Sequence, residues 1–132
     1  MTALLDTSVV VRYFVNEDET PAATRLIESG EALHIPLVVI SETAHVLHTV
    51  YRVPRSEVVD VLLSLLERDG IDVLDVPTDL VREALLLARP SRRVSVDDCL
   101  IWALARAAGS DTVVHSFDQR FPRDGIDLRV PR

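Results

Sequence analysis

Short apolar runs alternate along the chain with longer stretches in which apolar residues recur at helical spacing. Five runs have the length and composition of buried strands: 3–6, 33–35, 71–76, 113–115 and 128–130. The stretches between them predict six helices: 7–14, 20–29, 37–52, 56–68, 78–88 and 96–108. This alternation favours an α/β fold, in which helices flank a short central parallel sheet.

Length and composition limit the class of protein. A chain of 132 residues is long enough to bury the core of one domain, so we expect a single domain over 1–132. The one cysteine, Cys99, lies among apolar residues and has no partner for an internal disulfide, which favours a reducing cytoplasm. No apolar run approaches the roughly 20 residues of a membrane helix, and the first residues do not resemble a signal peptide.

The charge pattern restricts the possible chemistry. A formal charge of −7, from 21 acids and 14 bases, argues against a general phosphate-binding surface, so any contact with nucleic acid must be local. All fourteen bases are arginine. The absence of lysine disfavours phospho-receiver domains and haloacid-dehalogenase-like phosphatases, which use a lysine near the reacting aspartate, and the chain has no P-loop motif.

Three acidic residues stand at predicted strand ends or helix starts, and a fourth lies inside a predicted helix. Asp6 ends the first strand, Asp118 follows the fourth, Asp98 lies near a helix start and Glu42 lies inside a helix. Each has a structural alternative: a helix cap for Asp6 and Asp98, a turn for Asp118, a solvent-facing helix position for Glu42. Carboxylates that converge repel one another unless a cation compensates, and oxygen ligands select Mg²⁺ or Mn²⁺ over zinc.

These residues, taken in order, resemble one known family. The segments are LLDTSVVV around Asp6, Glu42 in a mid-chain helix, DCLIWA beginning at Asp98, and VVHSFD ending at Asp118. Together they resemble the PIN domains, specifically the VapC-type toxins of bacterial type II toxin–antitoxin systems, over essentially the whole chain. Trp102 departs from the pattern, because the family usually has a small residue there.

The resemblance implies a PIN-like fold with four to five strands and about six to seven helices, and metal-dependent endoribonuclease activity. By the same resemblance, Asp6 and Asp98 are the principal ligands of Mg²⁺, with Mn²⁺ as an alternative. Glu42 and Asp118 complete the acidic pocket directly or through water. Asp97, an additional acid before Asp98, is a further candidate ligand; its alternative is an exposed acid favoured by the helix dipole.

The resemblance also suggests supporting residues. Ser8 or Ser116 would orient the acids. Local bases must contact the RNA, and the candidates are Arg12, Arg89, Arg92 and Arg93. Solvated arginines that serve solubility are the alternative for each.

Partners follow from the family as well. The resemblance implies a homodimer and a small VapB-like antitoxin that blocks the acidic pocket, with no role for a membrane. The competing hypothesis is a PIN-like module that has lost catalysis and acts only by binding protein partners. The retention of all four acids weighs against that hypothesis.

Overall fold

The computed structural model of the chain describes residues 2–74, 94 and 96–132. The expected helix over 78–88 lies outside these residues, as do three of the candidate RNA contacts: Arg89, Arg92 and Arg93. No helix in the described ranges is long and apolar enough to cross a membrane.

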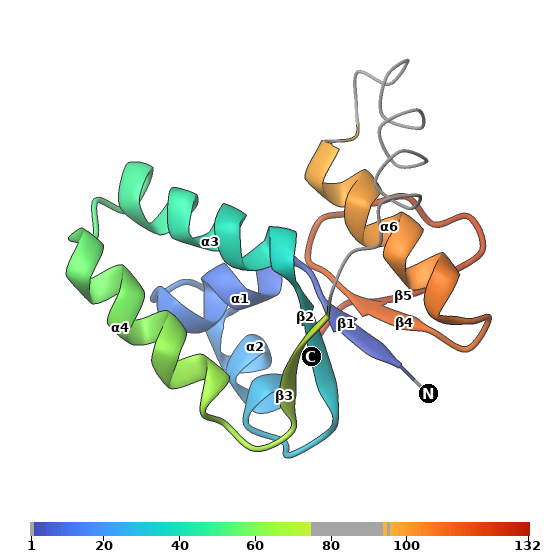
Figure 1. Ribbon diagram of the computed structural model, residues 1–132, viewed down its shortest axis with the longest axis horizontal. Coiled ribbons are helices and arrows are strands. Elements are labelled where there is room, and N and C mark those ends of the chain that lie inside the picture. The colour runs from blue at the N-terminus through green and yellow to red at the C-terminus, as the bar shows by residue number, and fades with distance from the viewer. Residues whose placement is uncertain (1, 75–93, 95) are drawn as a thin grey trace.

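A five-stranded parallel sheet forms the centre of the fold (Figure 1). Its strands are β1 (Ala3–Leu5), β2 (Leu33–Pro36), β3 (Ile71–Leu74), β4 (Val113–His115) and β5 (Asp127–Arg129). They lie in the order β3-β2-β1-β4-β5, and every neighbouring pair runs parallel. The predicted α/β architecture and its strand number are therefore confirmed.

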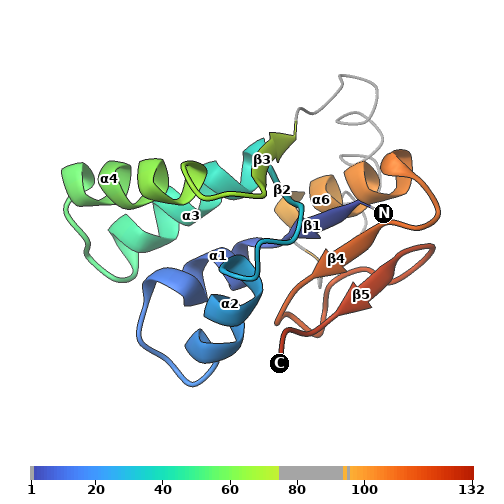
Figure 2. The same ribbon diagram turned by 90° about the horizontal axis from the view of Figure 1, so that it is seen from below.

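Five helices lie in the described part of the chain, fewer than the six to seven expected. They are α1 (Thr7–Phe14), α2 (Thr20–Ile27), α3 (Leu37–Thr49), α4 (Arg55–Leu66) and α6 (Val96–Ala108). The steps from β1 to β2 and from β2 to β3 go one way across the sheet, and the step from β3 to β4 returns past β1. Right-handed crossovers therefore place α6 on the opposite face from α1 to α4, in agreement with Figures 1 and 2.

The core is built around β1, which is paired on both sides and covered on both faces. Leu4 and Leu5 are completely buried, as are Val9 on α1 and Ile101 on α6. A strand enclosed in this way cannot alternate polar with apolar residues, which explains why the sequence shows an unbroken apolar run before Asp6.

The chain order also fixes where a ligand can bind. Strands β2 and β3 extend the sheet from one side of β1, whereas β4 and β5 extend it from the other. The carboxyl ends of β1 and β4 therefore lie side by side, and the Asp6 amide donates to the His115 carbonyl at 3.0 Å. In open α/β sheets, such a reversal of strand order opens a crevice at the carboxyl ends of the strands.

Candidate active site

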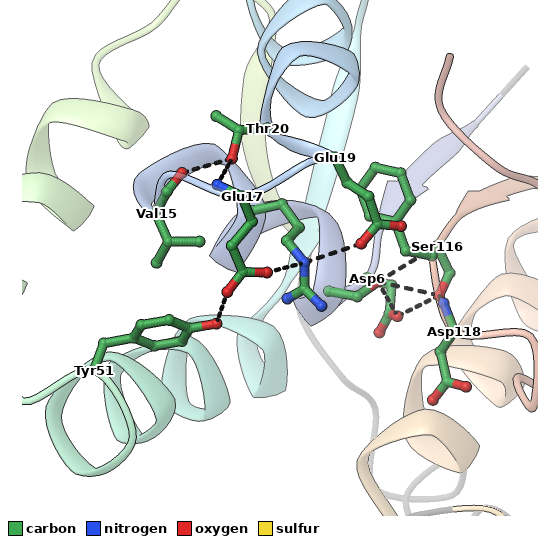
Figure 3. Close-up of polar contacts among 11 residues, drawn as sticks. Asp6, Val15, Glu17, Glu19, Thr20, Tyr51, Ser116 and Asp118 are labelled. Atoms are coloured by element: carbon green, nitrogen blue, oxygen red, sulfur yellow. Dashed lines mark hydrogen bonds and ion pairs between the residues drawn. The ribbon is translucent and has the colours of Figure 1, made fainter.

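Asp6 is the first residue after β1, and its carboxylate faces the carboxyl end of β4. The residue occupies the N-cap position of α1, yet its side chain makes no capping hydrogen bond. Its Oδ2 instead accepts hydrogen bonds from Ser116 Oγ at 2.5 Å and from Ser8 Oγ at 3.0 Å (Figure 3). The alternative that Asp6 serves as a helix cap is therefore wrong for its side chain.

Two serines join the start of α1 to the segment after β4. The Ser8 and Ser116 hydroxyl oxygens lie 3.3 Å apart. Ser8 Oγ also accepts the Phe117 amide at 2.9 Å, and Ser116 Oγ accepts the Asp118 amide at 2.9 Å. The serines thus hold the Asp6 carboxylate in one orientation and fix the backbone that carries Asp118.

The environment of Asp6 is unfavourable for an isolated charge. The residue is 2% exposed, and its Oδ1 is buried without a hydrogen-bond partner among the described residues. Burial raises the pKa of Asp6, and the charge of Asp118 adds to that rise. Hydrogen bonds from Ser116, Ser8 and the Thr7 backbone act in the opposite direction. A buried carboxylate with one unpartnered oxygen is the kind of group that a bound cation stabilises.

One pocket of about 280 Å³ collects the acids that the sequence singled out. Asp6 comes from the end of β1, Glu42 from α3, Asp98 from the first turn of α6 and Asp118 from the segment after β4, and all four line this pocket. Asp98 is buried and Glu42 is half-buried. Residues separated by as many as 112 positions therefore meet at the carboxyl end of the sheet.

Arg12 stands in the wall of the same pocket and is held by two acids. Its Nε lies 3.0 Å from Glu17 Oε2 and 3.1 Å from Glu19 Oε1 (Figure 3). The Tyr51 hydroxyl donates to Glu17 Oε1 at 2.5 Å, which ties the segment after α3 to this group. Arg12 is therefore held in a fixed place beside the acids, with its own charge offset.

Arg120 is a pocket residue that the sequence reasoning missed. Its amide donates to Asp118 Oδ1 at 2.9 Å, and its Nε lies 3.6 Å from the same oxygen. The first contact is the turn hydrogen bond expected of an aspartate, so the structural alternative for Asp118 is confirmed alongside its place in the pocket. The sequence could have indicated Arg120, because it lies two residues after Asp118. A turn closed by the aspartate side chain brings the residue two positions later close to the carboxylate.

Asp97 is not among the residues that line the pocket. It stands one position before Asp98 on α6, and successive helical residues point about 100° apart around the axis. Asp97 is half-buried, and burial raises its pKa. The structure therefore gives no support to Asp97 as a further ligand.

The donors of the pocket fit a hard divalent cation. Within 2–74, 94 and 96–132, no three acid, histidine or cysteine side chains converge closely enough to enclose an ion. Mg²⁺ does not need such an enclosure, because it usually binds one or two carboxylates and retains several waters. The orphaned Oδ1 of Asp6 and the all-oxygen acidic lining match that mode of binding.

Comparison with known proteins agrees with this geometry. The sequence matches the PIN domain family over residues 3–125. It is 31% identical to the VapC ribonuclease of Aquifex aeolicus (strain VF5) over 133 residues, which covers 97% of this chain and 96% of that protein.

Two solved structures share the fold. VapC20 of Mycobacterium tuberculosis, described as a toxin that cleaves the sarcin-ricin loop, has a TM-score of 0.73 at 21% identity over 91% of this chain and 92% of its own. A toxin–antitoxin complex from Klebsiella pneumoniae has a TM-score of 0.61 at 17% identity over 95% of each chain. The family match and the Aquifex relative span nearly the whole sequence. The chain therefore belongs to the PIN domain family, among the VapC-type toxin ribonucleases.

Proposed function

We propose that the chain is an Mg²⁺-dependent endoribonuclease, the toxin of a toxin–antitoxin pair, which hydrolyses RNA phosphodiester bonds at its acidic pocket. One observation carries the proposal: Asp6 is buried with an unpartnered oxygen, in a pocket that it shares with Glu42, Asp98 and Asp118. The 31% sequence identity to a VapC ribonuclease supports RNA as the substrate and hydrolysis as the reaction.

Asp6 and Asp98 are the proposed ligands of the cation, with Glu42 and Asp118 acting directly or through water. Mn²⁺ can replace Mg²⁺ at such a site, because both are hard cations that prefer oxygen. When bound, the cation lowers the pKa of a water molecule and neutralises charge on the phosphodiester.

The side chains around the acids have separate tasks in this proposal. Ser116 and Ser8 donate to Asp6 Oδ2, which stabilises the ionised carboxylate and leaves Oδ1 without a partner among the described residues. Among the described residues, Arg12 and Arg120 are the positively charged groups in the pocket wall, and in this proposal they contact a phosphate of the RNA. Preorganised groups of this kind supply orientation and charge stabilisation without reorganising during the reaction.

An antitoxin is the proposed protein partner. The Klebsiella relative was solved as a toxin–antitoxin complex, which supports a small VapB-like partner for this chain. An arginine of such a partner would pair well with the four carboxylates and block the pocket. A homodimer and a location in the cytoplasm complete the proposal.

A catalytically silent binding module is the competing function. A binding module does not need four acids in one pocket. In this chain all four acids are present and line one cavity, and two serines hydrogen-bond to Asp6. These contacts favour catalysis.

The test is cleavage of structured RNA by the purified chain with Mg²⁺, with Mn²⁺ and with chelator. Because the cation supplies both the activated water and the charge neutralisation in this proposal, we expect cleavage with either metal and none in chelator. The same titration followed by melting should show stabilisation by metal, since a ligand at 100 times its Kd adds about 2.7 kcal/mol. Cleavage that persists in chelator, or an absence of both cleavage and stabilisation with every divalent ion, contradicts the proposal.

A further inference from the structure

A second cavity, of about 670 Å³, lies between α2, the ends of β4 and β5, and the last residues of the chain. Figure 2 shows the C-terminal end between α2 and β5, and Arg25 Nε on α2 donates to the Arg132 carbonyl at 3.1 Å. None of the residues that line this cavity lines the acidic pocket. It is a separate site that the proposed catalytic chemistry does not use.

Positive charge is concentrated in this cavity. Among the residues that the structure describes, three arginines line it, Arg25, Arg129 and Arg132, against one acid, Glu31. Arg129 also pairs with Asp127, its neighbour on β5, at 2.8 Å. In a chain with a formal charge of −7, a lining with three bases and one acid is a local exception, and guanidinium groups are well suited to phosphate.

A buried histidine also lines this cavity. His115 lines the cavity and is 8% exposed, and its Nδ1 is buried without a partner among the residues described. Burial lowers the pKa of His115, and the charge of Arg129 lowers it further. An imidazole ring that lines the cavity can donate to a phosphate oxygen or accept from a ribose hydroxyl.

Apart from Ser29, the remaining described lining is apolar. Leu26 on α2 and Leu128 on β5 are partly buried, and Val130 is 53% exposed at the edge. Phosphate alone would not need an apolar wall or a space of this size. A nucleotide uses both the apolar wall and the larger space, because its phosphate pairs with arginine while its base stacks on an apolar or aromatic surface.

We propose that this cavity is a second RNA subsite, which binds one unpaired nucleotide of the substrate strand with its phosphate on Arg25 and Arg129. The inference rests on the proposed ribonuclease function, which makes RNA the ligand. Strand β4 connects the two sites directly, since His115 lines the cavity and the next residue, Ser116, binds Asp6. In this proposal, the substrate strand crosses the carboxyl end of β4 between the two sites.

The experiment measures binding rather than cleavage. A fluorescent, unstructured 12-nucleotide RNA is titrated with the chain in chelator, using anisotropy at several salt concentrations. We expect the Arg25→Gln/Arg129→Gln double variant to bind roughly tenfold more weakly and to lose about 0.7 from the salt slope for each phosphate contact removed. Both side chains are exposed, so the fold should survive, and circular dichroism checks that it does.

A matched control removes the same charge elsewhere. Arg55→Gln/Arg123→Gln also takes two positive charges from exposed positions, and neither residue lines the cavity or the acidic pocket. The control should retain nearly wild-type affinity. Equal loss in both double variants would mean that only net charge matters, and an unchanged affinity in the cavity variant would mean that RNA does not enter; either result overturns the inference.

A second readout needs no variant. The ring resonances of His115 should shift when the RNA is added to wild-type chain in chelator, and inorganic phosphate at the same concentration should shift them much less. An unshifted His115 under saturating RNA contradicts the subsite. Failure of the proposed ribonuclease function gives a different result. If the chain binds RNA through the cavity but cleaves it with no metal, the ribonuclease proposal is wrong and the RNA subsite stands.

Discussion

Replacement of Asp6 by asparagine is expected to lower the rate of RNA cleavage in Mg²⁺ by at least about 100-fold, since even the loss of a partner beside a metal ligand costs 10- to 100-fold. The variant keeps an oxygen that can accept from Ser8 and Ser116 but removes the charge that a cation needs. Single-turnover cleavage of one defined RNA measures the effect.

The same substitution should leave the fold intact. Burial raises the pKa of Asp6, so the ionised carboxylate destabilises the folded state above that raised pKa. The penalty disappears as the pH falls through the folded pKa toward the unfolded value near 3.8. In chelator, Asp6→Asn should therefore melt at or above the temperature of the wild type at pH 7, and the difference should shrink as the pH approaches 4.

Asp60→Asn is the matched control for this experiment. Asp60 is exposed on α4 and lines neither the acidic pocket nor the second cavity, the one that Arg25 and Arg129 line. Its variant should cleave and melt like the wild type. If Asp6→Asn retained more than about a tenth of the activity, the proposed role of Asp6 as a metal ligand would be wrong, since ligand loss should exceed that. If it melted far below the wild type in chelator, the loss of activity would reflect unfolding.

Replacement of Ser116 by alanine is expected to produce the second-largest effect, a loss of about 10- to 100-fold in activity or metal affinity. Its hydroxyl makes the 2.5 Å contact with Asp6 Oδ2 and also accepts the Asp118 amide. Without it, Asp6 loses the hydrogen bond that most strongly favours its charged form, and the backbone of Asp118 is released. The Mg²⁺ concentration that gives half-maximal cleavage should rise, and excess metal should restore part of the rate.

Two further serine variants interpret this result. Ser110→Ala, at an exposed position outside the pocket, should behave as the wild type. Ser8→Ala removes the longer of the two contacts to Asp6, at 3.0 Å, and should have the smaller effect. A Ser116→Ala protein with an unchanged metal dependence would show that the serine has no part in holding the acid.

The fold and the acids of the site were predictable because each leaves a local signal. An apolar run that ends in Asp6 indicates a buried strand delivering an acid, and strands that alternate with helices predict that such ends meet at one edge. The sheet and the convergence of the four acids on one pocket agree with this reasoning. Helix capping was the wrong alternative for Asp6 because the serine donors that occupy its carboxylate include one 110 residues away.

The walls of the sites were not predictable from the same signals. The ion pairs of Arg12 with Glu17 and Glu19 depend on where a loop returns, and no periodicity specifies that. Arg25 and Arg129 come from distant segments to line the second cavity. They meet there because β5 pairs with the edge of β4 and the end of the chain contacts α2. Side-chain direction and loop path, which composition cannot supply, decide both features.

The most direct test of the account is to locate a cation in crystals of the wild-type chain soaked with Mn²⁺, using anomalous diffraction. We predict an anomalous peak within about 2.5 Å of Asp6 Oδ1 and of a carboxylate oxygen of Asp98, in the pocket that Glu42 and Asp118 also line. A peak that lies outside this pocket, or a pocket that stays without Mn²⁺ at concentrations that support cleavage, would contradict the claim that these carboxylates hold the catalytic metal.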